Sequence, residues 1–553
     1  MSPRTLVPLL AFVAVGAAAS PPLPATYLVL ALPEGGPVLL EARDVTLTAL
    51  PAPAAPRRAD RTGVELEAGA DGSWPREWRV GVETSRRGEF ASPTGIDGIR
   101  VPHPAPPFVV RIPRREAEGL VVRGESGHEL RIDRALFDAA RMLAAPTGEV
   151  VTLQRSGSAA NRLDLLVVGD GYTVAERDAF LADATNVFHT FTAASPYAEY
   201  AGAFNASALF VASAQSGADH PAYRAGCLDG DDSCCPDDDA VGDPRAGQNV
   251  DTAFDATYCT AGIFRLLSVD ESQVFRAAAA APDWDAILVI VNDPTYGGAG
   301  GLLAVTSMHP QATAIAQHEI GHSFTGLADE YETPYPGFPD CSDTFPMSPP
   351  CEVNVTDVTD RLSLKWRGWV RDETPIPTPA SSPWLDAVGL FEGARYVSAG
   401  KYRPKAHCLM RSLGVPFCPV CSAAFVAMLY DGGWGAPADG IDLIEPGSER
   451  PAPGAVRLAV GGNVEFSVDQ LDPGPAAAVD ARWSVDGTPA GIGAIFTLHT
   501  APCLDHSLAV RLDVADMGPF GDPLATSPLG VTSRSWSVET ACTPRVRSRV
   551  PAR

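Results

Sequence analysis

Two histidines four residues apart, His318 and His322, stand with Glu319 in the run HEIGHSFTGLADEY at residues 318–331. Four residues is close to one turn of an α-helix, so both imidazoles would project from one face of a predicted helix. At that separation a single Zn²⁺ can bridge them. Glu319, directly after the first histidine, can act on a metal-activated water as a general base without binding the metal itself. These three residues predict a hydrolytic zinc centre.

Catalytic zinc is held by three protein side chains and keeps one position open to solvent, so a third ligand is needed. Gly326 can end the helix in a backbone conformation that a residue with a Cβ resists. The chain can then fold back and bring Asp329 to the metal, with Glu330 as the alternative ligand. The competing interpretation is an amphipathic helix with packed or solvated histidines. The glycine and the acidic pair after the motif disfavour it.

Length and charge restrict the kinds of protein this chain can be. Its 553 residues exceed a single hydrophobic core and predict about two to four domains. The formal net charge is -25, and no basic stretch interleaved with aromatic residues occurs. Nucleic acid and anionic membrane surfaces are therefore disfavoured as partners, and a soluble protein in an extracellular medium is favoured.

The first residues are typical of a secretory signal peptide. Arg4 supplies a positive charge, residues 6–15 an apolar core, and residues 17–20 a small-residue cleavage zone. We expect residues 1–20 to be a signal peptide and the mature protein to be exported, either to a periplasm or out of the cell. A buried first strand or helix is the alternative. The apolar run is short for a membrane span, and no second one follows it.

Eleven cysteines in an exported chain favour disulfide bonds over free thiols. Partners within a cluster are expected, notably Cys341 with Cys351 and Cys503 with Cys542. The odd count leaves one thiol unpaired or engaged elsewhere. The clusters are Cys227, Cys234, Cys235 and Cys259; Cys341 and Cys351; Cys408, Cys418 and Cys421; and Cys503 and Cys542.

The apolar pattern alternates near both ends of the chain. Residues 21–148 contain short alternating segments between Pro- and Gly-rich turns, which indicates an N-terminal β-sandwich domain. Alternation returns in residues 437–545, where Trp483 and Trp536 lie on predicted strands and indicate an immunoglobulin-like β-sandwich. Residues 546–553 predict a disordered tail. The predicted strands are 26–32, 38–42 and 77–82 near the N-terminus, and 456–460, 464–468, 481–485, 509–514 and 533–538 near the C-terminus.

Residues 149–436, between these parts, predict a mixed α/β domain that carries the active-site helix. The continuous apolar run at 163–169 (LDLLVVG) is typical of a strand covered on both faces. Thr173 is a candidate N-cap for a helix over residues 175–195. Two more strands are predicted, at 204–213 and 285–293. The fold class is therefore α/β, flanked by two all-β sandwiches.

A glycine-rich segment, residues 292–301, precedes the zinc helix. Glycines let a backbone lie close to another group, and a peptide that pairs here as an added strand is one interpretation. A plain turn is the alternative. We take Gly297 and Gly298 as candidate substrate contacts. Tyr296 and Tyr331 are candidates for stabilising an oxyanion, although either could simply pack.

Over roughly residues 150–435, the chain resembles the IgA peptidase-like metallopeptidase family, zinc endopeptidases related to the metzincins. The resemblance implies a metzincin-like catalytic domain that binds Zn²⁺ and acts on proteins or peptides. It does not imply that this chain cuts immunoglobulins. The strings that carry the resemblance are VVGDGYT at 167–173, SGADHP at 216–221, TAFDATY at 252–258, TYGGAGG at 295–301, HEIGHSFTGLADEY at 318–331 and CLMRSLGVPFCPVC at 408–421.

The resemblance also suggests roles for single residues. In metzincins a methionine in a tight turn lies under the metal site, and Met410 is similar to that residue; a core methionine is the alternative. The metzincin pattern has its third ligand six residues after the second histidine, where this chain has Ala328. The string GLADEY suggests Asp329 instead, with Glu330 as the alternative, and a carboxylate can serve Zn²⁺.

The cluster of Cys408, Cys418 and Cys421 has two interpretations. Its spacing is similar to that in archaemetzincins, so a second, structural zinc with a fourth ligand is one of them. Export to an oxidising compartment favours the other, a disulfide that holds the methionine turn. Redox catalysis would need a thioredoxin-like βαβ setting that is not evident.

The acidic loop at residues 229–243 offers carboxylates for Ca²⁺ but lacks the full EF-hand spacing, and a solvated turn is favoured.

Together these features predict an exported zinc endopeptidase in which His318, His322 and Asp329 hold the metal and Glu319 is the general base. The alternative from another class is an exported multidomain protein that binds glycans or proteins and carries a vestigial metal site. The intact HExxH with an acidic third position argues against it. A zinc peptidase whose third ligand is a Glu on a later helix is a further alternative, but no such helix stands out. The oligomeric state is not predicted.

Overall fold

The computed structural model describes most of the chain from residue 22 onward. The predicted signal peptide, the predicted tail, Cys503 and Cys542 lie outside the described residues. Among the described residues, no helix has both the length and the apolar character needed to cross a membrane. The described residues are 22–48, 61–67, 77–92, 95–114, 117, 119–141, 148–228, 231, 233–301, 303–334, 338–431, 440–475, 479–499, 506–521 and 530–541.

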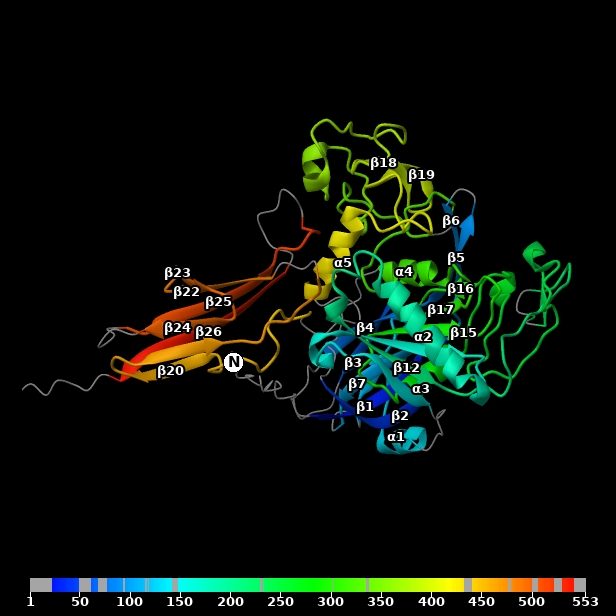
Figure 1. Cartoon of the computed structure of the whole chain (residues 1–553). Coiled ribbons are helices and arrows are strands. Elements are labelled where there is room, and N and C mark those ends of the chain that lie inside the picture. The colour runs from blue at the N-terminus through cyan, green and yellow to red at the C-terminus, as the bar shows by residue number, and fades with distance from the viewer. Residues whose placement is uncertain are drawn as a thin grey trace, which may run out of the picture.

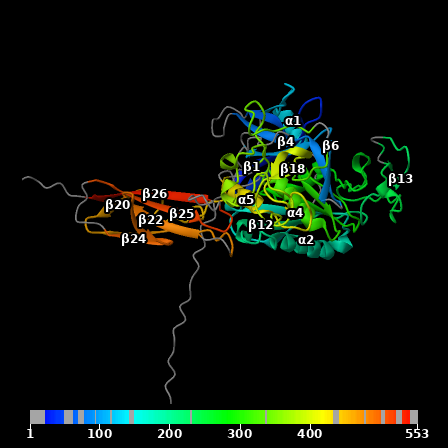
Figure 2. The same cartoon turned by 90° about the horizontal axis from the view of Figure 1, so that it is seen from above.

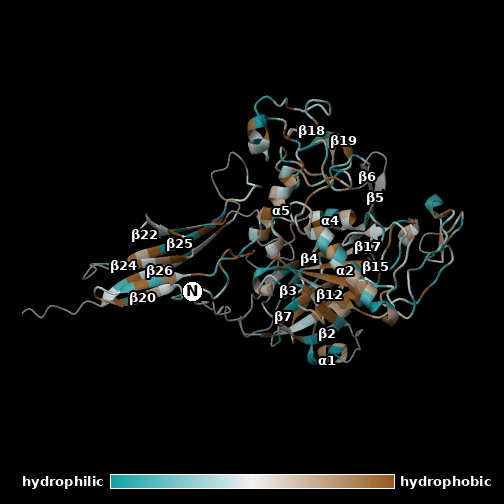
Figure 3. Cartoon of the chain, viewed as in Figure 1, coloured by the Kyte–Doolittle hydropathy of each residue, from teal (hydrophilic) through white to brown (hydrophobic). Residues whose placement is uncertain are grey.

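A six-stranded mixed sheet forms the centre of the molecule. The run LDLLVVGD forms β11 (Leu163–Asp170), which pairs in parallel with the strands on both sides. Its side chains alternate between two cores, with Leu165 and Val167 in one and Leu166 and Val168 in the other. Both faces are thus covered, as the apolar run predicts, and the strands of this sheet are largely brown in Figure 3. The sheet order is β10 (Glu149–Gln154), β12 (Phe204–Phe210), β11, β15 (Ala286–Val291), β17 (Ala304–Ser307) and β16 (Gly298–Ala299).

Helices cover both faces of this sheet (Figure 1). On one face lie α2 (Arg177–Thr192), α4 (Ala312–Ser323) and α5 (Pro419–Asp431). On the other lies α3 (Glu271–Ala278). The predicted helix at 175–195 is a short 3₁₀ turn followed by α2, and the Glu176 carboxylate accepts a hydrogen bond from the Thr173 backbone N–H at 2.9 Å. The molecule is therefore mixed α/β, with several sheets and few helices.

The N-terminal strands form two small sheets and a hairpin. The first sheet is β2 (Val38–Leu47), β1 (Leu23–Ala31) and β7 (Pro107–Pro113), and the second is β4 (Glu77–Glu83), β3 (Arg61–Glu67), β8 (Val121–Arg123) and β9 (Glu129–Arg131), followed by α1 (Arg134–Arg141).

The sequence pattern predicts strands with one exposed face here, but β1 is buried on both faces. Leu28 and Leu30 pack into an N-terminal core, while Tyr27 and Val29 join the core beneath the central sheet. The two cores therefore share β1, so the N-terminal sheets are packed directly onto the central sheet.

The hairpin β5 (Ser85–Ser92) and β6 (Gly95–Pro102) reaches from these sheets to the edge strand β16 (Figure 1). Arg87 and Gly300 form an antiparallel bridge with two backbone hydrogen bonds, each 2.8 Å long. The edge of the central sheet is therefore continued by a strand from the N-terminal part of the same chain.

The C-terminal strands form two sheets that extend away from the rest of the molecule in both views (Figures 1 and 2). Trp483 and Trp536 are buried between them with Phe466, as the alternating pattern predicts. The pattern misses β23 and β24, which are short and mostly exposed. One sheet is β20 (Gly454–Ala459), β26 (Gly530–Ala541), β25 (Leu508–Asp516), β22 (Val479–Val485) and β23 (Thr488–Ile492), and the other is β21 (Asn463–Ser467) and β24 (Ile495–His499). The domain boundaries remain predictions.

Two further strand pairs lie in the long connections: β13 (Ala222–Tyr223) with β14 (Cys234–Cys235), and β18 (Phe391–Ala394) with β19 (Val397–Arg403).

Candidate metal centre and catalytic site

Helix α4 places His318 and His322 on one face, one turn apart. Their Nε2 atoms lie 3.0 Å from each other. Each Nδ1 donates to a backbone carbonyl, from His318 to Leu409 at 2.9 Å and from His322 to Leu327 at 2.7 Å. Because a carbonyl only accepts, these bonds fix the hydrogen on Nδ1 and leave both Nε2 lone pairs directed at the same point.

The chain reverses after α4 and brings Asp329 to that point. Gly326 has a φ of 71°, a left-handed conformation, and its N–H donates to the His322 carbonyl at 3.0 Å. Beyond this turn, the Asp329 Oδ1 atom lies 3.2 Å from the Nε2 of His318 and 3.0 Å from the Nε2 of His322. Of the acidic pair, Asp329 is therefore the residue that joins the histidines.

The three donor atoms fit a metal ion. They lie 3.0 to 3.2 Å from one another, and all three residues are at most 1% exposed. Donors about 2.0–2.1 Å from a tetrahedral zinc would be about 3.3 Å apart. Two imidazole lone pairs and a carboxylate oxygen directed at one buried point repel one another unless a cation lies between them. The donor set suits Zn²⁺.

Met410 lies in a turn beneath α4. The Ser412 N–H donates to the Cys408 carbonyl at 3.0 Å, and the Glu330 N–H donates to the Met410 carbonyl at 2.7 Å. A Cβ added at Gly321 would lie 2.8 Å from the Met410 sulfur, so that glycine allows the turn to approach the helix. The turn supports both the helix and the segment after it that carries Asp329.

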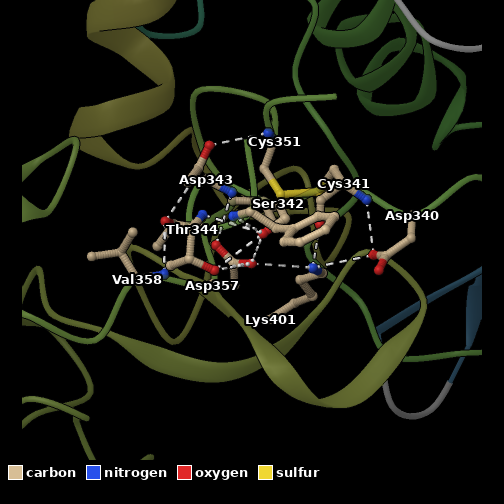
Figure 4. A network of polar contacts seen from close by, with 12 residues as sticks. Asp340, Cys341, Ser342, Asp343, Thr344, Cys351, Asp357, Val358 and Lys401 are labelled. Carbon is tan, nitrogen blue, oxygen red and sulfur yellow. Dashed lines mark hydrogen bonds and ion pairs between the residues drawn. A yellow bond between two sulfur atoms is a disulfide. The ribbon is translucent and has the colours of Figure 1, made fainter. Parts of the chain in front are cut away.

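Asn354 fixes the backbone beside Asp329. Its side chain accepts from the Ala328 N–H at 2.8 Å and donates to the Ala328 carbonyl at 2.8 Å. Asn354 follows a loop that the Cys341–Cys351 disulfide closes, and the partly buried Asp343 and Asp357 carboxylates organise that loop (Figure 4). The predicted pairing of Cys341 with Cys351 is confirmed.

Tyr396 is a site residue that the sequence does not reveal. Its hydroxyl donates to Asp329 Oδ2, the oxygen that faces away from the histidines. The residue lies in the turn between β18 and β19 with a φ of 68°, and its N–H donates to the Tyr331 carbonyl at 3.0 Å. Nothing in its spacing from the HExxH motif marks it, because the pairing of two distant loops brings it there.

Glu319 is buried beside the histidines, only 2% exposed. Its Oε2 lies 3.7 Å from Nη2 of Arg87, and the Arg87 Nε lies 3.3 Å from the Glu83 Oε1. A Cβ at Gly300 would overlap the Glu319 carboxylate, so only glycine fits there. The sequence predicts a position open to solvent. Instead the site is closed, because the β5–β6 hairpin lies across it.

The residues predicted to contact the substrate or to stabilise an oxyanion pack against other parts of the protein. Tyr331 is buried, and its ring packs against Tyr396, 5.4 Å away. Tyr296 stacks edge-on against His309, and a Cβ on Gly297 would lie 2.5 Å from the Tyr258 ring. Gly298 pairs with Thr306 in the sheet. Among the glycines of that segment, the one beside Glu319 is Gly300, which sequence reasoning did not select.

The three cysteines near the methionine turn form no disulfide. The Cys408 and Cys421 sulfurs lie 3.7 Å apart, and the three cysteines are free thiols. This corrects the favoured prediction of a disulfide, which needs sulfurs about 2.05 Å apart. Glu330 joins them, with its Oε1 3.3 Å from the Cys421 sulfur. Burial, and then the neighbouring Cys408, raises the pKa of Glu330 well above its usual value.

In the acidic loop, the carboxylates that the structure describes bind other protein groups and do not converge on a common point. Disulfides join Cys227 to Cys234 and Cys235 to Cys259, as clustering predicts. Within the described part of this loop, each of several carboxylates has its own protein partner, and calcium binding remains a prediction. Asp237 accepts from the Phe264 N–H, Asp238 from the Tyr223 hydroxyl, Asp239 pairs with Arg265, and Asp243 contacts His220.

Comparison with known proteins agrees with this centre. A family model described as IgA Peptidase M64 matches residues 151–226, 233–387 and 381–429, which include all four residues of the HExxH–Asp329 set. None of the curated proteins matches the chain. Among solved structures, the crystal structure of an FMN-binding beta-glucuronidase from Facaelibacterium prausnitzii L2-6 aligns at 10% identity over 95% of this chain and 75% of that one. The TM-score of that alignment is 0.13.

Proposed function

The chain belongs to the IgA Peptidase M64 family, and from this we propose that it is a zinc-dependent endopeptidase. Membership makes it a peptidase, with a protein or peptide substrate. The observation that supports zinc chemistry is the convergence of His318, His322 and Asp329, with donor atoms 3.0 to 3.2 Å apart. Glu319 lies directly beside this set on the same helix, which supports it as the base.

In the proposed reaction, different residues bind the metal, transfer the proton and position a metal ligand. His318, His322 and Asp329 would hold the ion, which when bound supplies Lewis-acid activation of water and of the scissile carbonyl. Glu319 takes a proton from the attacking water and delivers it to the leaving amine. Tyr396 holds Asp329 through the carboxylate oxygen that the histidines do not face. The amide bond is cleaved between its carbonyl carbon and nitrogen, with water added across it.

We also propose that the protein is exported. Three disulfides lie in the described residues, and such bonds form and persist in oxidising compartments. The predicted signal peptide also supports export.

Metal removal tests the proposal. Dialysis against a strong zinc chelator should abolish cleavage of an unstructured peptide library, and zinc added back should restore it. Without the ion, the two imidazoles and the carboxylate cannot act as a Lewis acid toward the water or the scissile carbonyl. Cleavage is measured by mass spectrometry of the products. Undiminished cleavage by protein shown by metal analysis to be free of zinc would contradict the proposed chemistry.

A further inference from the structure

We propose that Cys408, Cys418, Cys421 and Glu330 form a second metal site, one that holds a zinc ion and fixes the turn beneath the catalytic centre. The donor atoms of these four residues all lie within 4.8 Å of one another, and all four residues are at most 1% exposed. Three sulfurs and one oxygen form a soft donor set, which suits Zn²⁺ rather than Ca²⁺ or Mg²⁺.

The distances match a tetrahedral ion. Sulfurs bound about 2.3 Å from zinc lie about 3.8 Å apart, and Cys408 and Cys421 are 3.7 Å apart. A sulfur and a carboxylate oxygen on the same ion lie about 3.5 Å apart, and Cys421 and Glu330 are 3.3 Å apart. A disulfide between Cys408 and Cys421 would need their sulfurs about 1.6 Å closer.

Glu330 lies in an environment that a lone carboxylate would avoid. It is fully buried, Asn354 donates to its Oε1 at 3.0 Å, and its Oε2 has no hydrogen-bond donor among the described residues. A buried carboxylate is costly unless positive charge lies close to it; Arg403 supplies one such charge, and a bound zinc would supply a direct partner. Arg411, which donates to the Glu330 carbonyl at 2.9 Å, offsets part of the negative charge of three thiolates and a carboxylate.

The two metals would be bound by neighbouring residues of one segment, because Asp329 and Glu330 follow each other in the chain after α4. In an extended chain successive side chains point to opposite sides, so Asp329 faces the histidines while Glu330 faces the cysteines. Between them, the Met410 carbonyl accepts from the Glu330 N–H and the Leu409 carbonyl holds His318. The second ion would therefore fix the backbone that orients the catalytic ligands.

Metal counting on the full chain tests this site. Wild type should hold two zinc ions per chain, and Glu330→Gln and Cys421→Ser should each hold one. Glu332→Gln, a half-exposed carboxylate two residues along, should still hold two. If the variants fail to fold, the cobalt-loaded wild type decides, because only this site gives a thiolate-to-cobalt absorption band. One zinc in the wild type, no thiolate band, or a disulfide among the three cysteines in the native protein would overturn the site.

A separate observation, the closure of the catalytic centre, supports a second proposal. We infer that the β5–β6 hairpin is an inhibitory segment that occupies the place of a substrate strand. This inference rests on the proposed peptidase function. The backbone N–H and C=O of Gly300 each bond to Arg87 at 2.8 Å, the pattern by which an added peptide strand pairs with a sheet edge. A substrate using the same groups would compete with the hairpin.

The side chain of Arg87 completes the block. The residue is 1% exposed, and its guanidinium lies between Glu83 and the catalytic Glu319, at 3.3 and 3.7 Å. His318, Glu319, His322 and Asp329 are all at most 2% exposed beneath it. No peptide can reach the base or the metal ligands while this contact stands.

The hairpin is held by contacts that can be broken. Arg86 and His103 both contact Glu271 at 3.0 Å, where α3 begins. The disulfides of the described residues all lie within 227–351, so none of them ties the hairpin down. Displacement of the hairpin, or cleavage of the chain that carries it, would open the site without unfolding the central sheet.

Arg87→Ala in the full chain tests the block. It removes the cation between Glu83 and Glu319, so the two buried carboxylates disfavour the closed state. We expect a chromogenic chelator to strip the catalytic zinc about tenfold faster or more, and initial peptide cleavage to rise by a similar factor. Arg79→Ala, which removes an exposed pair with Glu65 on the neighbouring β4–β3 sheet, should change neither rate.

The two readouts separate the proposals. Faster zinc release without any cleavage would support the block and contradict the peptidase function. Release and cleavage no faster than in Arg79→Ala would overturn the block. Should Arg87→Ala fail to fold, hydrogen exchange of the wild type decides: a bound peptide hydroxamate should expose the amides of β5, and unchanged protection with the inhibitor bound would overturn the block.

Discussion

Glu319→Gln is expected to bind as much zinc as the wild type and to cleave peptides about 10² to 10⁴ times more slowly. The amide keeps the shape of the side chain but cannot accept a proton from water at neutral pH. Glu319 is not one of the three residues whose donor atoms converge, which are His318, His322 and Asp329. The zinc content should therefore not change. Metal analysis and product-resolved peptide cleavage on one sample measure both quantities.

The matched control is Glu149→Gln, which removes an exposed carboxylate on β10 that pairs with Arg177. It should leave both zinc content and cleavage unchanged. Cleavage by Glu319→Gln within a few-fold of the wild type would remove Glu319 as the base. Loss of zinc from that variant would instead assign it a role in metal binding.

Asp329→Ala is expected to lose the catalytic zinc and with it essentially all cleavage. Two histidines without a carboxylate leave the ion with fewer protein ligands than catalytic zinc sites have. The second zinc of our proposal, bound through Glu330 on the opposite side of the backbone, should remain, so the metal count should fall by one. A variant that keeps its full metal content and cleavage would show that another residue is the third ligand.

The ligands on and just after the HExxH helix can be predicted from the sequence because their positions depend on local geometry. Helical spacing alone places His318 and His322 on one face, and Gly326 provides the reversal that carries Asp329 back. The two-face burial of 163–169 also follows from its continuous apolar run. These features depend on interactions within a few residues or on a simple periodicity.

The remaining features depend on contacts between distant parts of the chain. Tyr396 reaches Asp329 across 67 residues, and Arg87 reaches Glu319 from the N-terminal sheets. The choice between Asp329 and Glu330 depends on which side of an extended strand faces α4, which spacing leaves open. For the cysteine cluster, an oxidising compartment predicts a disulfide, but the fold places the buried Glu330 beside three free thiols as a fourth donor, which the spacing of the cysteines does not reveal.

Because the catalytic site is closed, slow peptide cleavage by the full chain would not by itself show that the protein lacks catalytic zinc. A freshly made full chain that cleaves slowly agrees with the hairpin block, and the metal-release rate distinguishes it from a protein without catalytic zinc.

Anomalous X-ray diffraction at the zinc edge, on crystals of the full chain, tests the central claim most directly. We predict a strong peak bonded to Nε2 of His318, Nε2 of His322 and Oδ1 of Asp329. A structure with the Asp329 carboxylate turned away from the imidazoles, or with no anomalous peak between them in zinc-supplemented crystals, would contradict it.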